Sequence, residues 1–223
     1  MHKIAHRTAA VLAATACSAQ AADVIELWPE GAPNKSTITA AEETNAQGSI
    51  FNVTRARLEV SAPANPNGKA VIVIPGGGYG NLSMSTIEKS FVPFFHSQGF
   101  TTFVLKYRLP KGNPEVPLAD ANKAVETVRS LFGKYNLMGA SAGGHLAAMS
   151  SVSCKGAACP DFSVLVYPNI TMMQEESQPK SSCRNNLIGP ARSVKYDTTF
   201  SAYKHVSLTT PPAFLAVSAG DEY

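Results

Sequence analysis

Charged side chains are scarce in this chain of 223 residues: Asp, Glu, Lys and Arg together make up 16%, and the formal net charge is only +3. The basic residues are scattered rather than clustered, so the sequence lacks the electrostatic footprint of a protein that binds nucleic acid. Apolar residues make up 44% of the chain. This excludes a disordered or collagen-like chain, because both classes lack the residues to build a core. Length and composition together predict one globular domain.

Long hydrophobic runs are also missing, since no stretch reaches the roughly 18 consecutive apolar residues of a membrane helix. The N-terminus instead has the three-part pattern of a signal peptide: a basic start at residues 1–7, a small apolar run at 8–16, and an Ala-Gln-Ala sequence that ends at Ala21. We therefore expect residues 1–21 to be removed. Residues 22–223 would form the mature domain, exported to the periplasm or the extracellular space and free of the membrane.

The chain has only four cysteines. Cys17 lies in the expected signal peptide, which leaves Cys154, Cys159 and Cys183. In an oxidising compartment two of these can pair, and a bond between Cys154 and Cys159 would close a short loop around residues 155–156. An isolated C-x4-C spacing, with no second cysteine pair and no clustered histidines, is not the pattern of a metal site. We expect one structural disulfide, one odd thiol and no metal.

Four apolar runs predict buried strands, and the segments between them have helical patterns. The runs are residues 71–74, 101–105, 163–167 and 213–217. Apolar residues recur at three- and four-residue steps from Leu118 to Phe132, which predicts an amphipathic helix, and a shorter helix is expected over residues 90–97. Strands that alternate with helices predict one α/β domain: a mostly parallel, doubly wound sheet with helices on both faces. Chemistry is expected at the carboxyl ends of its strands.

The sequence Gly-Ala-Ser-Ala-Gly-Gly at residues 139–144 matches the G-x-S-x-G nucleophile elbow. It follows the apolar pair 137–138 and precedes a helical pattern that begins at His145, so strand, sharp turn and helix come in the order that the elbow needs. Glycines tolerate the strained turn and the tight packing around it, and the helix N-terminus favours developing negative charge. The motif predicts Ser141 as a nucleophile. The alternative interpretation is an ordinary turn rich in glycine and serine.

A second glycine-rich turn, residues 75–80, directly follows the first predicted strand. Backbone N–H groups that no side chain shields can stabilise the tetrahedral oxyanion of ester hydrolysis, and one such donor is worth on the order of 3 kcal/mol. We assign the donors to Gly77 and Gly78, completed by the N–H of Ala142. A phosphate-binding loop would need Gly-Lys-Ser/Thr after the glycines, and Asn81 stands where a dinucleotide-binding motif has its last glycine.

The acid of a catalytic triad is predicted at Asp221, which follows the last predicted strand. An Asp at the carboxyl end of a strand, after the serine in chain order, is placed to orient a histidine. The histidines before it do not fit the role of the base. His145 lies four residues after Ser141 and should point along the helix rather than at the hydroxyl, while His96 and His205 look like a helix-end and a surface residue.

Taken together, these elements resemble exported α/β-hydrolase esterases of the carbohydrate acetyl esterase and feruloyl esterase type, over nearly the whole mature chain. The segments that carry the resemblance are residues 27–33 (Leu-Trp-Pro-Glu-Gly-Ala-Pro), 75–80, 106–109 (Lys-Tyr-Arg-Leu), 139–145, 167–168 (Tyr-Pro) and 211–215. Pro75, where the lipase branch usually has a histidine, favours the sugar-esterase branch. The resemblance implies an α/β-hydrolase fold that cleaves small, acetyl-type esters from plant polysaccharide or related sugars without a metal or an organic cofactor.

The resemblance also implies a catalytic histidine a few dozen residues beyond the acid, whereas this sequence ends two residues after Asp221. We therefore expect a C-terminally truncated domain without its last strand and helix, with an exposed apolar edge at residues 214–217. Such a chain would be inactive or weakly active, because Ser141 would have no base. Two other functions stay open: a non-catalytic carbohydrate-binding or scaffold protein of the same fold, and a serine peptidase.

Overall fold

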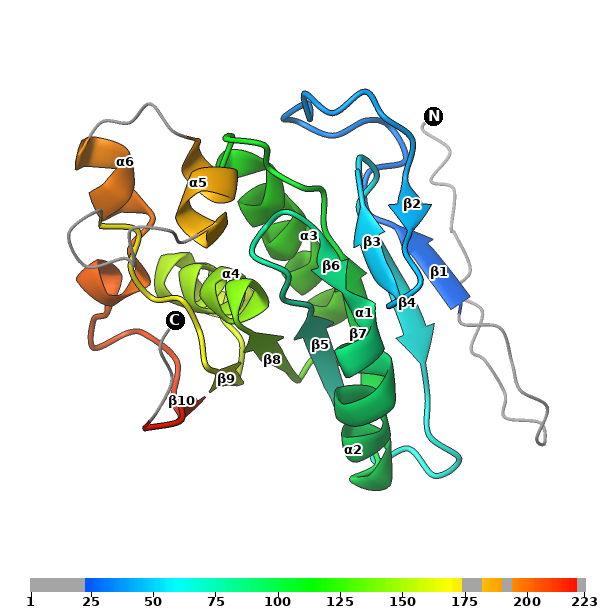
Figure 1. Ribbon diagram of the computed structural model, residues 1–223. Coiled ribbons are helices and arrows are strands. Elements are labelled where there is room, and N and C mark those ends of the chain that lie inside the picture. The colour runs from blue at the N-terminus through cyan, green and yellow to red at the C-terminus, as the bar shows by residue number, and fades with distance from the viewer. Residues whose placement is uncertain (1–22, 174–181, 190–193, 220–223) are drawn as a thin grey trace, which may run out of the picture.

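The computed structural model describes residues 23–173, 182–189 and 194–219, which form a central sheet covered by helices (Figure 1). The sheet has seven strands in the order β1-β4-β7-β5-β8-β9-β10. These are β1 (Asp23–Glu26), β4 (Arg57–Ser61), β5 (Ala70–Ile74), β7 (Thr101–Lys106), β8 (Tyr135–Ala140), β9 (Phe162–Val166) and β10 (Ala213–Ala216). A small second sheet consists of β2 (Glu43–Thr44), β3 (Ser49–Phe51) and β6 (Leu82–Ser83). The expected signal peptide lies outside the described residues.

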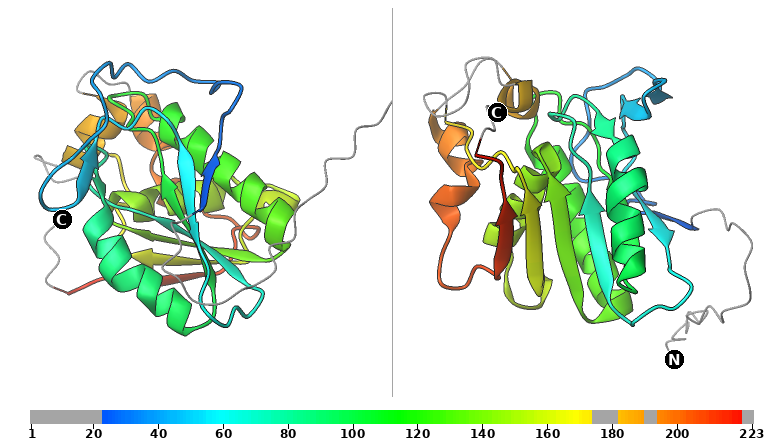
Figure 2. Two further views of the ribbon diagram at one scale, coloured as in Figure 1. Left: turned by 90° about the vertical axis from the view of Figure 1, so that its right-hand side faces the viewer. Right: turned by 60° about the horizontal axis from the view of Figure 1, so that its bottom comes forward.

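The helices lie on both faces of the large sheet, as the sequence predicted. They are α1 (Met84–Thr86), the π-helical turn η1 (Ile87–Phe91), α2 (Val92–Ser97), α3 (Glu115–Phe132), α4 (Ala142–Ser153), the short turn η2 (Gly156–Ala158), α5 (Ser182–Ile188), α6 (Val194–Thr199) and the short turn η3 (Ala202–His205). α3 and α4 pack side by side on one face, and α2 covers the other (Figure 2). Among the described helices, none is long and apolar enough to cross a membrane.

The parallel core of the sheet is formed by β7, β5, β8 and β9, with β10 parallel to β9. Every residue of β5 and β7 is buried. Because helices cover both faces, these strands need no polar alternation, and this explains their continuous β-branched runs. β8 is six residues long, longer than the apolar pair 137–138 indicated, because Gly139 and Ala140 complete the strand although their sequence is typical of a turn.

Two strands that the sequence did not predict extend the sheet at its other edge. β4 pairs antiparallel with β7, and β1 pairs antiparallel with β4. Two charged residues of β4 form ion pairs: Arg57 with Glu42, and Glu59 with the buried Lys106 of β7. Charged residues within β1 and β4 hide the strand pattern, because these two strands are only partly buried and need no continuous apolar run.

β10 is the last strand in the sheet order; its first three residues are exposed and the fourth is only partly buried. The exposed fractions are 56% for Phe214, 54% for Leu215 and 64% for Val217. Within the described part of the chain, β10 pairs with β9 alone. The apolar run here does form a strand, and the exposed apolar edge expected at residues 214–217 is confirmed.

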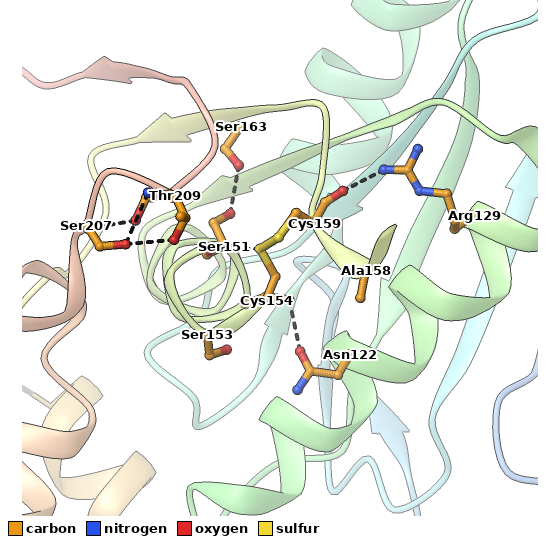
Figure 3. The surroundings of a disulfide bond; sticks show 12 residues. Asn122, Arg129, Ser151, Ser153, Cys154, Ala158, Cys159, Ser163, Ser207 and Thr209 are labelled. Carbon is orange, nitrogen blue, oxygen red and sulfur yellow. Dashed lines mark hydrogen bonds between the residues drawn. A yellow bond between two sulfur atoms is a disulfide. The ribbon is translucent and has the colours of Figure 1, made fainter. Parts of the chain in front are cut away.

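A disulfide bond between Cys154 and Cys159 joins the end of α4 to the segment that leads into β9. Figure 3 shows its surroundings: Arg129 of α3 donates to the carbonyl of Cys159, and the hydroxyl groups of Ser151 and Ser163 share a hydrogen bond of 2.8 Å. Cys183 is a free, buried thiol. One structural disulfide and one odd thiol are therefore confirmed, and the pairing is Cys154 with Cys159.

A buried ion pair between Arg108 and Asp120 connects three parts of the fold. Asp120, which is fully buried, accepts from Arg108 Nη2 at 2.6 Å, from the backbone N–H of Arg108 at 2.9 Å, and from the indole N–H of Trp28 at 2.7 Å. Burial raises the pKa of Asp120, against the opposing effect of the Arg108 guanidinium. The network fixes the N-terminal segment and the end of β7 to α3.

We expect Asp120→Asn to lower the free energy of unfolding by about 3–5 kcal/mol, because it leaves the buried Arg108 guanidinium without its counter-charge. Urea unfolding followed by circular dichroism measures the loss. Glu126→Gln is the matched control, since its ion pair with Lys123 is exposed and such pairs contribute about 1 kcal/mol or less. Equal losses in the two variants would contradict a structural role for the buried pair.

Candidate active site

Ser141 lies between the last residue of β8 and the first residue of α4, with φ 54° and ψ −122°. A residue other than glycine pays about 1–3 kcal/mol for such a backbone conformation, and residues of this kind cluster at active sites. Its N–H donates to the carbonyl of Val166 and its own carbonyl accepts from the N–H of His145, both at 3.0 Å. The side chain is partly exposed. The strand, turn and helix predicted from the G-x-S-x-G sequence are therefore present, with the strain at the serine.

Two glycines of the motif allow backbones to approach closely around the serine. A Cβ added to Gly139 would lie 2.2 Å from the carbonyl oxygen of Gly143, and a Cβ added to Gly143 would lie 2.1 Å from that of Ile74. Real Cβ atoms do not approach other atoms so closely, so both positions need glycine. The start of α4 thus packs directly against the ends of β8 and β5.

The glycine-rich turn that follows β5, residues 75–80, begins in contact with Ser141; we call it the oxyanion loop. Ile74 and Gly139 are paired in register, so β5 and β8 end at the same level. The chain leaves β5 toward the face covered by α2, and it leaves β8 toward α4 on the opposite face. The carboxyl ends of β5 and β8 therefore form the topological switch point, where ligands bind in sheets of this kind. A Cβ on Gly76 would lie 3.2 Å from the Cβ of Ser141.

The carbonyl groups of the oxyanion loop are held by hydrogen bonds, and this orients its N–H groups. The bonds are Ser83 N to Gly76 O (3.0 Å), and Gly80 N and Asn81 N to Gly77 O (3.0 and 3.2 Å). In a planar trans peptide the N–H points away from the preceding carbonyl, so these bonds fix the directions of the N–H groups of Gly77 and Gly78. Among the described residues neither N–H group has an acceptor. This matches what an oxyanion hole needs.

Tyr79 anchors the oxyanion loop in the core through His145. Its φ is 58°, its side chain is 1% exposed, and its hydroxyl lies 2.6 Å from Nδ1 of His145. Nε2 of His145 lies 2.8 Å from the carbonyl oxygen of Phe200. Because a carbonyl can only accept, Nε2 carries the proton and Nδ1 accepts from Tyr79. Burial lowers the pKa of His145 to about 4. His145 is therefore a neutral, structural residue, as the sequence predicted.

The other two described histidines also have partners away from Ser141. Nε2 of His96 lies 3.1 Å from the hydroxyl of Thr102 and 3.2 Å from that of Ser61, near the N-terminal end of β7. Nε2 of His205 lies 3.1 Å from the carbonyl of Thr198. Within the described part of the chain no group of residues could hold a metal ion. Asp221 lies outside the described residues, so its role as the acid stays a prediction.

Two residues that sequence reasoning missed also hold the oxyanion loop. The hydroxyl of Tyr107 donates to the carbonyl of Pro75 at 3.1 Å, and Nδ2 of Asn186 donates to the carbonyl of Gly78 at 2.9 Å. Burial raises the pKa of Tyr107 far above its usual value, so it stays a neutral donor. Tyr107 lies in the Lys-Tyr-Arg-Leu segment and could have been noticed there. Asn186 gave no local signal, because it lies 108 residues from Gly78.

A parallel sheet with a strained serine at its switch point and a glycine-rich loop beside it defines an α/β-hydrolase. The chain belongs to the BD-FAE family, whose model matches residues 58–223. It is 34% identical over 180 residues to an acetylxylan esterase of Xylanibacter ruminicola, which covers 75% of this chain and 36% of that protein. It is 29% identical over 167 residues to endo-1,4-beta-xylanase B of Butyrivibrio fibrisolvens, covering 65% of this chain and 26% of that one. The chain thus spans about a third of these relatives or less.

Solved structures agree with this assignment. The acetyl ester-xyloside bifunctional hydrolase of Caldicellulosiruptor lactoaceticus is 26% identical, with a TM-score of 0.63 over 87% of this chain and 74% of that chain. Apo esterase 2 of Thermogutta terrifontis is 21% identical, with a TM-score of 0.59 over 89% of this chain and 72% of that chain, and shows the same fold. The resemblance to xylan esterases and the α/β-hydrolase fold predicted from the sequence are confirmed.

His145 gives a pH-dependent contribution to stability. The pKa of a histidine is near 6.5 in an unfolded chain, against about 4 for His145 in the folded protein. Between these values the unfolded chain binds a proton that the folded chain does not. The free energy of unfolding therefore falls as the pH is lowered from 6.5 toward 4, by up to roughly 3 kcal/mol.

We expect His145→Gln to remove this part of the acid-induced loss, as read from urea unfolding at neutral pH and at about pH 4.5. His205→Gln is the matched control, because His205 is exposed, and it should keep the full loss. For each variant we compare the change in the free energy of unfolding between the two pH values, so a lower stability of the His145 variant at neutral pH does not affect the result. An equal change in both variants would contradict the lowered pKa of His145.

Proposed function

We propose that this protein is a serine hydrolase that cleaves small, acetyl-type esters from carbohydrate through an acyl-enzyme on Ser141. The position of Ser141 carries the proposal: a strained, partly exposed serine at the switch point of the sheet, beside a loop that begins within contact distance of it. Serines in this setting are the nucleophiles of α/β-hydrolases. The esterase names of the relatives support an ester as substrate.

The geometry suggests how the reaction would proceed. The Ser141 hydroxyl attacks the ester carbonyl, whose oxygen becomes negatively charged and accepts hydrogen bonds from the N–H groups of Gly77, Gly78 and Ala142. The sugar alkoxide leaves with a proton, and water then releases the acyl group from Ser141 as the free acid. The N–H of Ala142 belongs to the first turn of α4, where N–H groups have no partner within the helix.

Removal of the proton from the Ser141 hydroxyl needs a base, and this step limits the expected rate of hydrolysis. We propose that Asp221 orients a histidine that takes the Ser141 proton, but the three described histidines have other partners. An oxyanion hole and substrate binding alone leave only a residual rate. We therefore propose that residues 1–223 alone turn substrate over slowly.

A carbohydrate substrate is supported by the relatives and by one exposed aromatic side chain. The acetylxylan esterase and the acetyl ester-xyloside hydrolase carry sugar esters in their names. Tyr167 follows β9 at the level of Ser141, because Ala140 and Val166 are paired in register. It is 44% exposed, and an aromatic ring with a polar tip can contact both the apolar face and the hydroxyl groups of a sugar.

The test is covalent labelling of Ser141. We expect a fluorophosphonate to label this residue, and imidazole in the buffer to accelerate labelling by acting as a general base. Hydrolysis of p-nitrophenyl acetate should rise with imidazole above the background of Ser141→Ala, which should not label. Ser153→Ala is the matched control, since Ser153 lies exposed at the end of the same helix. Mass spectrometry of the labelled peptide identifies the site.

Protein that stays unlabelled with imidazole present would contradict the proposal. Tight binding of acetylated xylo-oligosaccharide with neither labelling nor acetate release would favour a carbohydrate-binding protein of the same fold. Labelled protein that cleaves aminoacyl amides faster than acetyl esters would favour a peptidase.

A further inference from the structure

Helix α5 packs against the oxyanion loop, far along the chain from it. Nδ2 of Asn186 donates to the carbonyl oxygen of Gly78 at 2.9 Å. A Cβ on Gly80 would lie 2.9 Å from the same Nδ2, and a Cβ on Gly78 would lie 3.1 Å from the hydroxyl of Ser182. Because Gly78 and Gly80 have no side chains, α5 can approach the loop closely enough for Asn186 to bind the carbonyl of Gly78.

The helix that carries Asn186 is itself held firmly. The backbone carbonyl of Asn186 accepts from the N–H of Gly112 at 2.8 Å. Arg184, two residues earlier on the helix, forms a buried ion pair with Asp197 at 2.8 Å and donates from Nε to the carbonyl of Met172 at 2.9 Å. Asn186 thus projects from a fixed support, so its side-chain amide can hold the loop in one place.

The peptide group that Asn186 binds lies between two residues with positive φ. These are Gly78, with φ 57°, and Tyr79, with φ 58°. Positive φ is costly for Tyr79, which has a Cβ. Rotating the Gly78–Tyr79 peptide by a half turn would change the φ of Tyr79 and relieve that cost. The same rotation would turn the carbonyl oxygen of Gly78 away from α5 and toward the side that the N–H of Tyr79 now faces.

We propose that Asn186 is a positioning residue of the oxyanion hole: its side-chain amide holds the Gly78–Tyr79 peptide in its strained orientation and so keeps Gly78 in place beside Ser141. The inference rests on the proposed function, because it concerns the same hole. The hydrogen bonds inside the loop fix the carbonyl of Gly77, and Asn186 fixes the carbonyl of Gly78. Both peptide groups that flank the Cα of Gly78 are then fixed: the first directs its N–H, and the second keeps its Cα in place.

The test compares Asn186→Asp with Asn185→Asp. A carboxylate at position 186 can only accept and would repel the carbonyl oxygen of Gly78. We expect the maximal rate of fluorophosphonate labelling of Ser141, with imidazole present, to fall about tenfold or more, since losing one oxyanion donor costs about a hundredfold to a thousandfold. The fluorophosphonate concentration that gives half the maximal rate should not change. Asn185 is exposed on the same helix, and Asn185→Asp should keep the wild-type rate.

A second variant, Asn186→Ala, removes the donor without adding charge and should lower the maximal rate by less than Asn186→Asp. If Asn186→Asp does not fold, the Asn186→Ala variant still tests the proposal. Labelling is measured well below the unfolding temperature of each variant. A lower unfolding temperature with an unchanged labelling rate would overturn the proposal, because it would show a merely structural contact. Failure of the wild-type protein to label would instead overturn the proposed function, so the two results are distinguishable.

Discussion

The close packing of bare backbone at the elbow is the constraint on which the rest of the site depends. Because Gly139 and Gly143 carry no side chains, the ends of β5 and β8 and the start of α4 meet in direct contact. Ser141 lies in the middle of this contact, with its N–H bound to β9 and its carbonyl bound to the first turn of α4. A relaxed backbone at Ser141 would break these contacts, so the neighbouring elements maintain its strain.

The oxyanion loop shows the complementary arrangement, in which carbonyl groups are held so that N–H groups stay available. Partners for the carbonyls come from inside the loop, from β6, from the end of β7 and from α5. The Tyr79 side chain adds a fifth support through His145 and the backbone of Phe200. Under the proposed function, donors that are fixed before the substrate arrives would need no reorganisation during the reaction, and this is how an oxyanion hole lowers a barrier.

The segments that carry the family resemblance have two different physical roles. Residues 75–80 and 139–145 shape the site itself. Trp28 and Arg108 belong to the segments 27–33 and 106–109, and both bind Asp120 of α3 in a buried network that does not include Ser141. This network holds the N-terminal segment on α3. A sequence motif by which this family is recognised can therefore be retained for its packing contacts, and need not contribute to the candidate active site.

The sequence by itself determined the features that local patterns encode. Continuous β-branched runs predicted β5 and β7, three- and four-residue spacing predicted α3, and the glycine patterns predicted the elbow and the loop beside it. Only the tertiary structure decided β1 and β4, the partners of His145, and the contact of Asn186 with Gly78. Such contacts join residues tens of positions apart. They arise when whole elements pack, and no periodicity within either segment records which distant backbone group a side chain will meet.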